Sequence, residues 1–152
     1  MLLSELLSAS RVKVPLTSRT KPEVLRELLE LVADGRTPGQ VSAMLEAISE
    51  RELVLSTGVG DGVAIPHGRT PYVDTLLLAA GVATQPIDFD ALDGRPVQLF
   101  FLLVGPESAS GAHVRALSRI SRLLRRDRLR ADLLSAGSPE AFLQVVQKSE
   151  AS

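Results

Sequence analysis

Apolar residues recur at helical spacing in several parts of the chain. A short amphipathic segment covers Met1–Leu7. A longer helix begins with Thr20-Lys21-Pro22-Glu23, where a capping threonine precedes a first-turn proline and a glutamate, and it ends before Gly35. The next helix opens at Thr37 and ends in Glu50-Arg51-Glu52. The same periodicity predicts helices over residues 110–124, with Ser110 as the cap, over residues 127–134, and from residue 138 onward.

Strand-like segments lie between these helices. Residues 76–82 and 97–104 are nearly continuous apolar runs, which is typical of central strands buried on both faces. Shorter strands are predicted at residues 12–14, closed by Pro15, and at 63–65, while residues 85–90 alternate ahead of an Asp93-Gly94 turn. Because the connections include helical crossovers as well as short turns, we expect one α/β domain over residues 1–152, with a mixed central sheet flanked by helices on both faces.

Composition narrows the class of protein. The chain has 152 residues, a net charge of -1, 3% aromatic residues and no cysteine. The near-neutral charge argues against bulk electrostatic binding to nucleic acid or membrane. The lack of cysteine removes disulfides and thiolate metal sites and is compatible with the cytoplasm. No apolar run reaches membrane-spanning length, so no direct membrane insertion is expected.

The residue most suggestive of chemistry is His67, which follows a short apolar run and lies between Pro66 and Gly68. Imidazole is the side chain that can act as a neutral nucleophile or base near pH 7, and loops at strand ends often carry function. The alternative is a loop histidine without a role. The only other histidine, His113, falls in the first turn of the helix after Ser110. Considered alone, it is better explained as a partly buried helix histidine.

Three further residues could complete an anion site with the histidines. Arg51 ends the second helix, and Ser56 and Thr57 lie in the glycine-rich stretch just before His67. A planar guanidinium, two hydroxyls and loop amides are groups that bind phosphate oxygens. The stretch lacks the spacing and the lysine of a nucleotide-binding P-loop. Taken singly, Arg51 is as well explained as a solvated surface charge.

Other functions find less support in the sequence. Seven arginines crowd residues 115–130, but without interleaved aromatic residues this pattern favours a solvated helix face over a nucleic-acid site. Two distant histidines without cysteine make a zinc site improbable, so no metal is expected. A Ser–His–Asp triad could be assembled around His67, but no nucleophile-elbow motif accompanies it.

The combined motif resembles enzyme IIA of the bacterial phosphoenolpyruvate-dependent sugar phosphotransferase system, of the fructose/mannitol type. Its stand-alone nitrogen-regulatory members are the most similar. The resemblance rests on Arg51-Glu52, on Ser56-Thr57 with the glycine-rich turn up to Gly62, and on Val63-Ala64-Ile65-Pro66-His67-Gly68. It continues through residues 86–97 to His113 and covers most of the chain.

The resemblance implies a phosphotransferase activity without cofactor. His67 would accept a phosphoryl group, at Nε2, from a small histidine-containing phosphocarrier protein and pass it to a cysteine of a IIB component. Arg51 and His113 would lie beside the phosphate, with Ser56 and Thr57 as further phosphate ligands. The phosphohistidine could serve sugar uptake or act as a regulatory signal read by target proteins. A third alternative is a non-catalytic binding module of the same fold.

Overall fold

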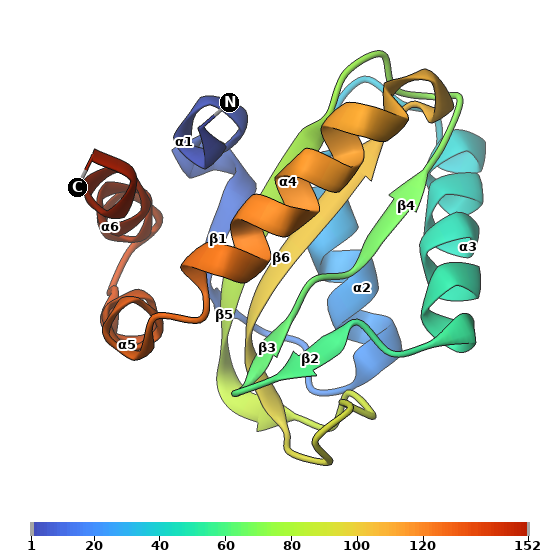
Figure 1. Ribbon diagram of the computed structural model, residues 1–152. Coiled ribbons are helices and arrows are strands. Elements are labelled where there is room, and N and C mark those ends of the chain that lie inside the picture. The colour runs from blue at the N-terminus through green and yellow to red at the C-terminus, as the bar shows by residue number, and fades with distance from the viewer. Residues whose placement is uncertain (1, 152) are drawn as a thin grey trace.

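The computed structural model describes residues 2–151, which form helices and a central sheet (Figure 1). The helices are α1 (Leu3–Leu6), α2 (Lys21–Glu30), α3 (Pro38–Val54), α4 (Ser110–Leu123), α5 (Asp127–Ser135) and α6 (Pro139–Ala151). The strands are β1 (Val12–Leu16), β2 (Gly58–Gly60), β3 (Val63–Ala64), β4 (His67–Arg69), β5 (Leu77–Ile87) and β6 (Val97–Gly105). Short 3-10 turns lie at Ala9–Arg11 and Glu107–Ala109.

The sheet is mixed, as expected. Its order is β1-β5-β6-β3-β2, and β4 also pairs with β6. The central β5–β6 pair is antiparallel, whereas β1 runs parallel to β5, and both β3 and β4 run parallel to β6. Strands β3 and β4 therefore follow one another along the same edge of β6, separated by Ile65 and Pro66. Pro66 has no N–H to give to a ladder, which accounts for the interruption.

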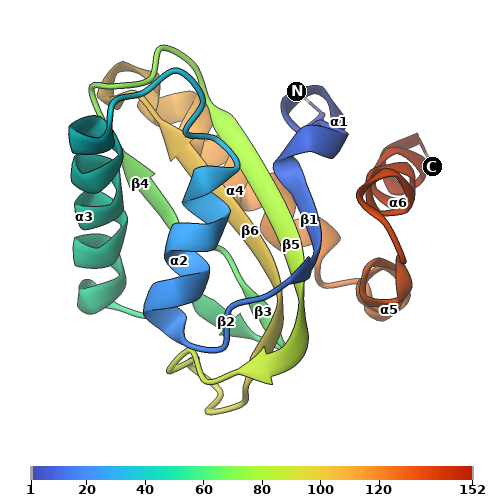
Figure 2. The same ribbon diagram turned by 180° about the vertical axis from the view of Figure 1, so that it is seen from behind.

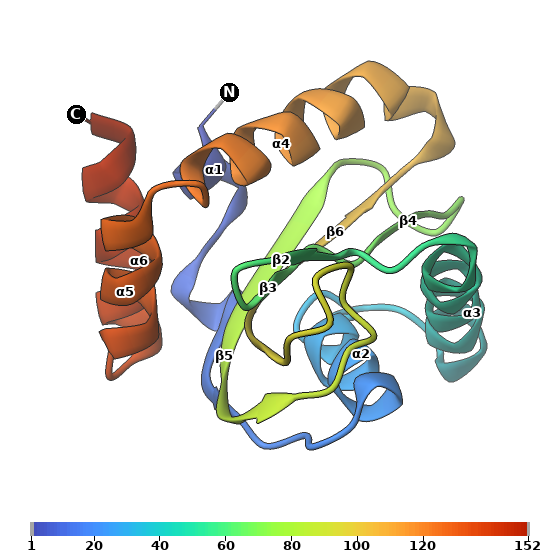
Figure 3. The same ribbon diagram turned by 60° about the horizontal axis from the view of Figure 1, so that its bottom comes forward.

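Helices cover both faces of the sheet (Figures 2 and 3). Alternate residues of β5 and β6 enter two separate cores: Leu78 and Phe101 pack with α4, α5 and α6 on one face, and Ala79 and Phe100 pack with α2 and α3 on the other. Burial on both faces explains why these strands read as continuous apolar runs. The expected α/β fold with a mixed, two-sided sheet is confirmed.

Several boundaries differ from the sequence-based expectations. Strand β1 continues through Pro15 to Leu16, because β1 pairs only with β5 and an edge strand tolerates a missing N–H. Strand β5 extends to Ile87 and so includes residues 85–87, which were expected to be separate from it. The glycine-rich stretch contains the short strand β2. Ser110 is the first residue of α4 and not its cap, since its hydroxyl donates to the carbonyl of Glu107 in the preceding turn.

The helix starts at α2 and α3 were predicted correctly. Thr20 accepts a hydrogen bond from the backbone N–H of Glu23, and Thr37 forms a full capping box with Gln40.

The N-terminal and C-terminal helices are joined by hydrogen bonds. The carboxylate of Glu150 on α6 accepts from the backbone N–H groups of Leu3 and Ser4, at 2.7 and 2.9 Å. The Nε of Arg119 on α4 donates to the same carboxylate.

Glu27 on α2 forms a buried carboxylate site that ties α2 to the segment after β1. It accepts from the backbone N–H and hydroxyl groups of Thr17 and Ser18, and it pairs with Lys13 at 2.7 Å. Burial opposes ionisation here, but the Lys13 ammonium and the four donors prevail and lower the pKa of Glu27 from 4.5 to about 2.

A lowered pKa in the folded state means that Glu27 contributes stability above its unfolded pKa. That contribution is present above pH 4.5 and is lost as the pH falls toward about 2. We expect Glu27→Gln to lower the free energy of unfolding at pH 7 by about 2 kcal/mol, because a charged acceptor of four hydrogen bonds is removed. Urea unfolding of both proteins between pH 7 and acid checks this: the difference between them should shrink as the pH falls.

Candidate functional site

His67 lies at the start of β4, paired with Leu103 of β6, so it is held by a strand and not by a free loop as the sequence suggested. Its neighbour Gly68 is buried against α3. A Cβ at Gly68 would come within 3.0 Å of the Ile48 side chain and 3.4 Å of the Ile48 backbone. The glycine therefore allows α3 to approach β4 closely, and this approach brings the end of α3 next to His67.

The imidazole of His67 is oriented by its own main chain. Its Nδ1 lies 2.9 Å from the carbonyl oxygen of Ile65. A carbonyl only accepts hydrogen bonds, so Nδ1 carries the proton of the neutral ring and Nε2 keeps its lone pair. Burial lowers the pKa of His67 below 6.5, and the Arg51 and Arg69 charges add to this, against the opposing effects of the Ile65 carbonyl and Glu52. The ring is thus neutral at pH 7, with Nε2 free.

His113 lies on the first turn of α4 directly beside His67. The two ring centroids are 5.6 Å apart, and the planes meet at 62°. Only 2% of His113 is exposed, and its Nδ1 has no hydrogen-bond partner among the described residues. Burial, together with the neighbouring His67 and Arg69 charges, lowers the pKa of His113 from 6.5 to about 4. His113 is therefore a neutral imidazole near pH 7.

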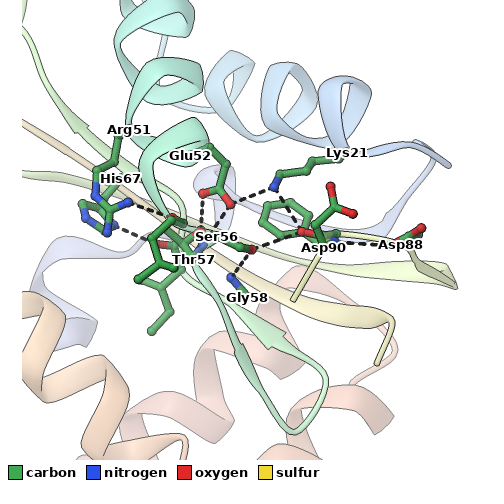
Figure 4. Close-up of polar contacts among 12 residues, drawn as sticks. Lys21, Arg51, Glu52, Ser56, Thr57, Gly58, His67, Asp88 and Asp90 are labelled. Atoms are coloured by element: carbon green, nitrogen blue, oxygen red, sulfur yellow. Dashed lines mark hydrogen bonds and ion pairs between the residues drawn. The ribbon is translucent and has the colours of Figure 1, made fainter. Parts of the chain in front are cut away.

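Two arginines approach this histidine pair from different elements. Arg51, on the last turn of α3, donates from Nη1 to the carbonyl of Leu55 at 2.8 Å, and its guanidinium lies beside the His67 ring (Figure 4). Arg69 follows His67 by two residues on β4 and donates to the hydroxyl of Ser110 at 3.0 Å. Residues two apart on a strand share a face, so Arg69 points to the same side as His67.

These side chains line one surface hollow between the end of α3 and the start of α4. Its lining residues are Ala47, Glu50, Arg51, Val54, His67, Gly68, Arg69, His113, Val114 and Leu117. Two of the apolar lining residues are exposed at the rim: Val54 is 80% exposed and Val114 is 59% exposed. A nucleophilic nitrogen, two permanent cations and a second neutral imidazole can together receive a tetrahedral anion and stabilise its charge.

Ser56 and Thr57 lie outside the lining of this hollow. The hydroxyl of Ser56 donates to the carbonyl of Phe89 at 3.1 Å and accepts from the backbone N–H of Gly58. The hydroxyl of Thr57 donates to the carboxylate of Glu52. Neither side chain lines the hollow. The structure thus brings together His67, His113 and Arg51 of the expected set and turns the two hydroxyls toward the protein interior.

Two residues near the site were not identified from the sequence. Arg69 could have been found by its alternation with His67, had the segment been recognised as a strand. Glu52 was noticed only as part of a motif, yet it is buried, with 6% exposed. Within residues 2–151 no three carboxylate or imidazole groups gather as a metal site, and no helix in that range is long and apolar enough to cross a membrane.

Comparison with known proteins shows the family of this chain. The profile of the family described as "Phosphoenolpyruvate-dependent sugar phosphotransferase system, EIIA 2" matches residues 5–149. A fructose-specific EIIABC component of Bacillus subtilis is 35% identical over 150 residues, which are 99% of this chain but 24% of that protein. The nitrogen regulatory protein of Pseudomonas aeruginosa is 37% identical over 144 residues, covering 95% of this chain and 94% of the relative.

A solved structure of a nitrogen regulatory protein is also similar to this chain. Nitrogen regulatory protein IIA-Ntr from Neisseria meningitidis superimposes with a TM-score of 0.86 at 32% identity, covering 95% of this chain and 98% of that one. The fold and these matches define the class as phosphocarrier domains of the phosphotransferase system. The chain belongs to the EIIA type 2 family of the phosphoenolpyruvate-dependent sugar phosphotransferase system.

Proposed function

We propose that this chain accepts a phosphoryl group on Nε2 of His67 from a histidine-containing phosphocarrier protein. It then passes the group to a cysteine of a IIB component or holds it as a regulatory signal, acting in the cytoplasm. The observation that carries the proposal is the bond between Nδ1 of His67 and the Ile65 carbonyl, which leaves Nε2 unprotonated beside Arg51. The family membership supports the same chemistry.

In the first step the lone pair of Nε2 attacks phosphorus while the donor's P–N bond breaks, and its electron pair returns to the donor imidazole. In the second step a thiolate attacks the phosphoryl group, a P–S bond forms, and the electron pair of the P–N bond returns to Nε2. The protein's task in such transfers is in-line placement and stabilisation of the equatorial oxygens. The donor is itself a phosphoprotein, so the proposal calls for no cofactor.

The surrounding residues take separate roles in this proposal. Arg51 and Arg69 supply permanent cations for the phosphoryl oxygens. His113, whose pKa is lowered to about 4 by burial and by the His67 and Arg69 charges, is a neutral hydrogen-bonding group when the phosphoryl group arrives. Ser56 and Thr57 remain predicted phosphate ligands that would have to leave their present bonds. The exposed apolar rim at Val54 and Val114 suits contact with a partner protein.

The regulatory use of the phosphohistidine is supported by the likeness to nitrogen regulatory relatives over nearly their whole length. Transport is supported by the fructose-specific relative. Adding purified IIB domains to the phosphorylated chain separates these two uses. A transport component discharges its phosphoryl group onto one of them, whereas a regulator keeps it and binds a target in a phosphorylation-dependent manner.

The experiment that tests the proposal is incubation with phosphoenolpyruvate, the general kinase of the system and the phosphocarrier protein, followed by intact mass measurement. We expect the gain of one acid-labile phosphoryl group that depends on all three components. A chain that gains none would be a binding module of the same fold.

The pH dependence of uptake follows from the lowered pKa of His67. Attack requires the unprotonated ring, and the pKa lies below 6.5, chiefly because of burial. We therefore expect the single-turnover rate of phosphoryl uptake to fall to half of its plateau value only below pH 6.5. Rapid-quench measurements with preformed phosphodonor check this, with spontaneous donor hydrolysis recorded in parallel. A half-maximal rate at or above pH 6.5 contradicts the assignment.

A further inference from the structure

Glu52 is a buried carboxylate near the histidine site, and both of its oxygens accept hydrogen bonds. Its Oε1 accepts from the backbone N–H of Thr57 at 2.8 Å and pairs with Nζ of Lys21 at 3.0 Å. Its Oε2 accepts from the hydroxyl of Thr57. A side chain on α3 is thereby joined both to the segment that follows α3 and to the first residue of α2 (Figure 4).

Arg51 and Glu52 are consecutive, so on a helix their side chains point in different directions. Arg51 lines the hollow with His67, whereas Glu52 points inward and is 6% exposed. The Arg51 cation therefore lies on the solvent side of the site, and the Glu52 carboxylate lies on its interior side.

The segment from Leu55 to Thr57 connects these two sides. The carbonyl of Leu55 accepts from Nη1 of Arg51 at 2.8 Å. The carbonyl of Thr57 accepts from the backbone N–H of Ile65 at 3.0 Å. The carbonyl of Ile65 in turn accepts from Nδ1 of His67 at 2.9 Å. The cation and the nucleophile of the site are therefore both hydrogen-bonded, directly or through one residue, to the segment that Glu52 holds.

The same segment is fixed from the side of α2. Lys21 donates to the carbonyl of Phe89 at 3.1 Å, and its ammonium lies 4.5 Å from the centre of the Phe89 ring. The hydroxyl of Ser56 donates to that same carbonyl. Phe89 is fully buried. Lys21 is thus a firmly held counter-ion, and the Glu52 carboxylate is fixed in position as well as in charge.

We propose that Glu52 is a positioning residue for phosphoryl transfer: by holding Thr57, it sets the orientation of both the Arg51 guanidinium and the His67 ring. This inference rests on the proposed function of His67. Ionised glutamate is an acceptor on both oxygens, so it satisfies the Thr57 N–H, the Thr57 hydroxyl and the Lys21 ammonium together. Glutamine of the same shape has one acceptor oxygen and no charge. Its NH2 group faces the Thr57 hydroxyl, which must then accept instead of donate, and the ion pair with Lys21 is lost, so the hold on Thr57 weakens.

The test is Glu52→Gln in single-turnover phosphoryl transfer from the phosphorylated phosphocarrier protein. We expect the rate constant at saturating donor to fall on the order of 10- to 100-fold, because small displacements of reacting groups cost rate. The donor concentration for half-saturation should change little, since the rim of the hollow is untouched. Thr57→Val removes the hydroxyl that the Glu52 carboxylate accepts from, so it should resemble Glu52→Gln.

A second measurement needs no phosphate donor. Long-range 1H–15N correlation spectra report which nitrogen of His67 carries the proton. In the unmodified protein we expect the Nδ1–H tautomer, and in Glu52→Gln a clear increase in the Nε2–H tautomer. If the unmodified protein takes up no phosphoryl group at all, the proposed function fails, and the tautomer comparison still decides whether Glu52 orients His67.

Glu27 provides the matched control. It is also a buried carboxylate, 7% exposed, that accepts from a threonine N–H and hydroxyl and pairs with a lysine. Glu27→Gln removes the same kind of charge away from the site, so it should lower stability but change neither the transfer rate nor the tautomer. An unaltered rate and tautomer in Glu52→Gln, or an equal loss in Glu27→Gln, overturns the proposal.

Discussion

His67→Ala leaves the chain unable to take up a phosphoryl group. The substitution removes the Nε2 lone pair that the structure presents beside Arg51. The ring contributes one hydrogen bond and is only partly buried, so the variant should fold, as circular dichroism can show. Intact mass after incubation with phosphoenolpyruvate, the general kinase and the phosphocarrier protein should show no phosphorylated species.

His113→Ala is the control for this prediction. The His113 and His67 ring centroids are 5.6 Å apart, but in the proposed mechanism the neutral, buried His113 is a neighbour of the acceptor and not the acceptor itself. Its loss should slow uptake and leave a slower, complete reaction. Full labelling of His67→Ala would contradict the prediction. If His113→Ala were also unlabelled, His113 and not His67 would be the acceptor.

Arg51→Ala should lower the rate constant of phosphoryl uptake on the order of 100- to 1000-fold, the cost of removing one preorganised group that stabilises transition-state charge. The bond of Arg51 to the Leu55 carbonyl holds its guanidinium beside the His67 ring. Rapid-quench uptake at saturating donor measures the effect. Arg51→Lys should recover only part of the rate, because an ammonium lacks the planar fork.

Arg36 offers a matched control for Arg51. It also donates to main-chain carbonyls, those of Val32, Asp34 and Tyr72, but it precedes α3, whereas Arg51 is on the last turn of that helix. Arg36→Ala should therefore keep the normal uptake rate. If Arg51→Ala took up the phosphoryl group as fast as Arg36→Ala, the proposed role of Arg51 at the phosphate site would be wrong.

The fold was predictable where burial pattern and local capping agree. The two-sided core explains the apolar runs of β5 and β6, and Thr20 and Thr37 mark the helix starts by their side-chain bonds. The short strands were harder to predict. β2 and β4 have three residues each, rich in glycine, and they exist because β3 and β6 present free ladder edges to them. Such pairing is set by tertiary contacts, which a sequence pattern does not contain.

Site residues of a type that is rare in this chain could be predicted from the sequence, whereas those of a common type could not. The chain has only two histidines, which singled out His67 and His113. Arg69 is one of many arginines, and only its strand position distinguishes it. Glu52 resembles any helix glutamate until its burial is known. The hydroxyls of Ser56 and Thr57 were expected at the phosphate, but nearer acceptors at Phe89 and Glu52 bind them in this structure.

The most direct test of the central claim is to identify the phosphorylated nitrogen itself. The 15N-labelled chain is phosphorylated enzymatically, and its imidazole nitrogens are observed by long-range 1H–15N correlation. The hydrogen bond from Nδ1 to the Ile65 carbonyl predicts a phosphoryl group on Nε2 of His67, with Nδ1 still protonated. A phosphoryl group on Nδ1 of His67, on His113 or on any other residue would contradict the account.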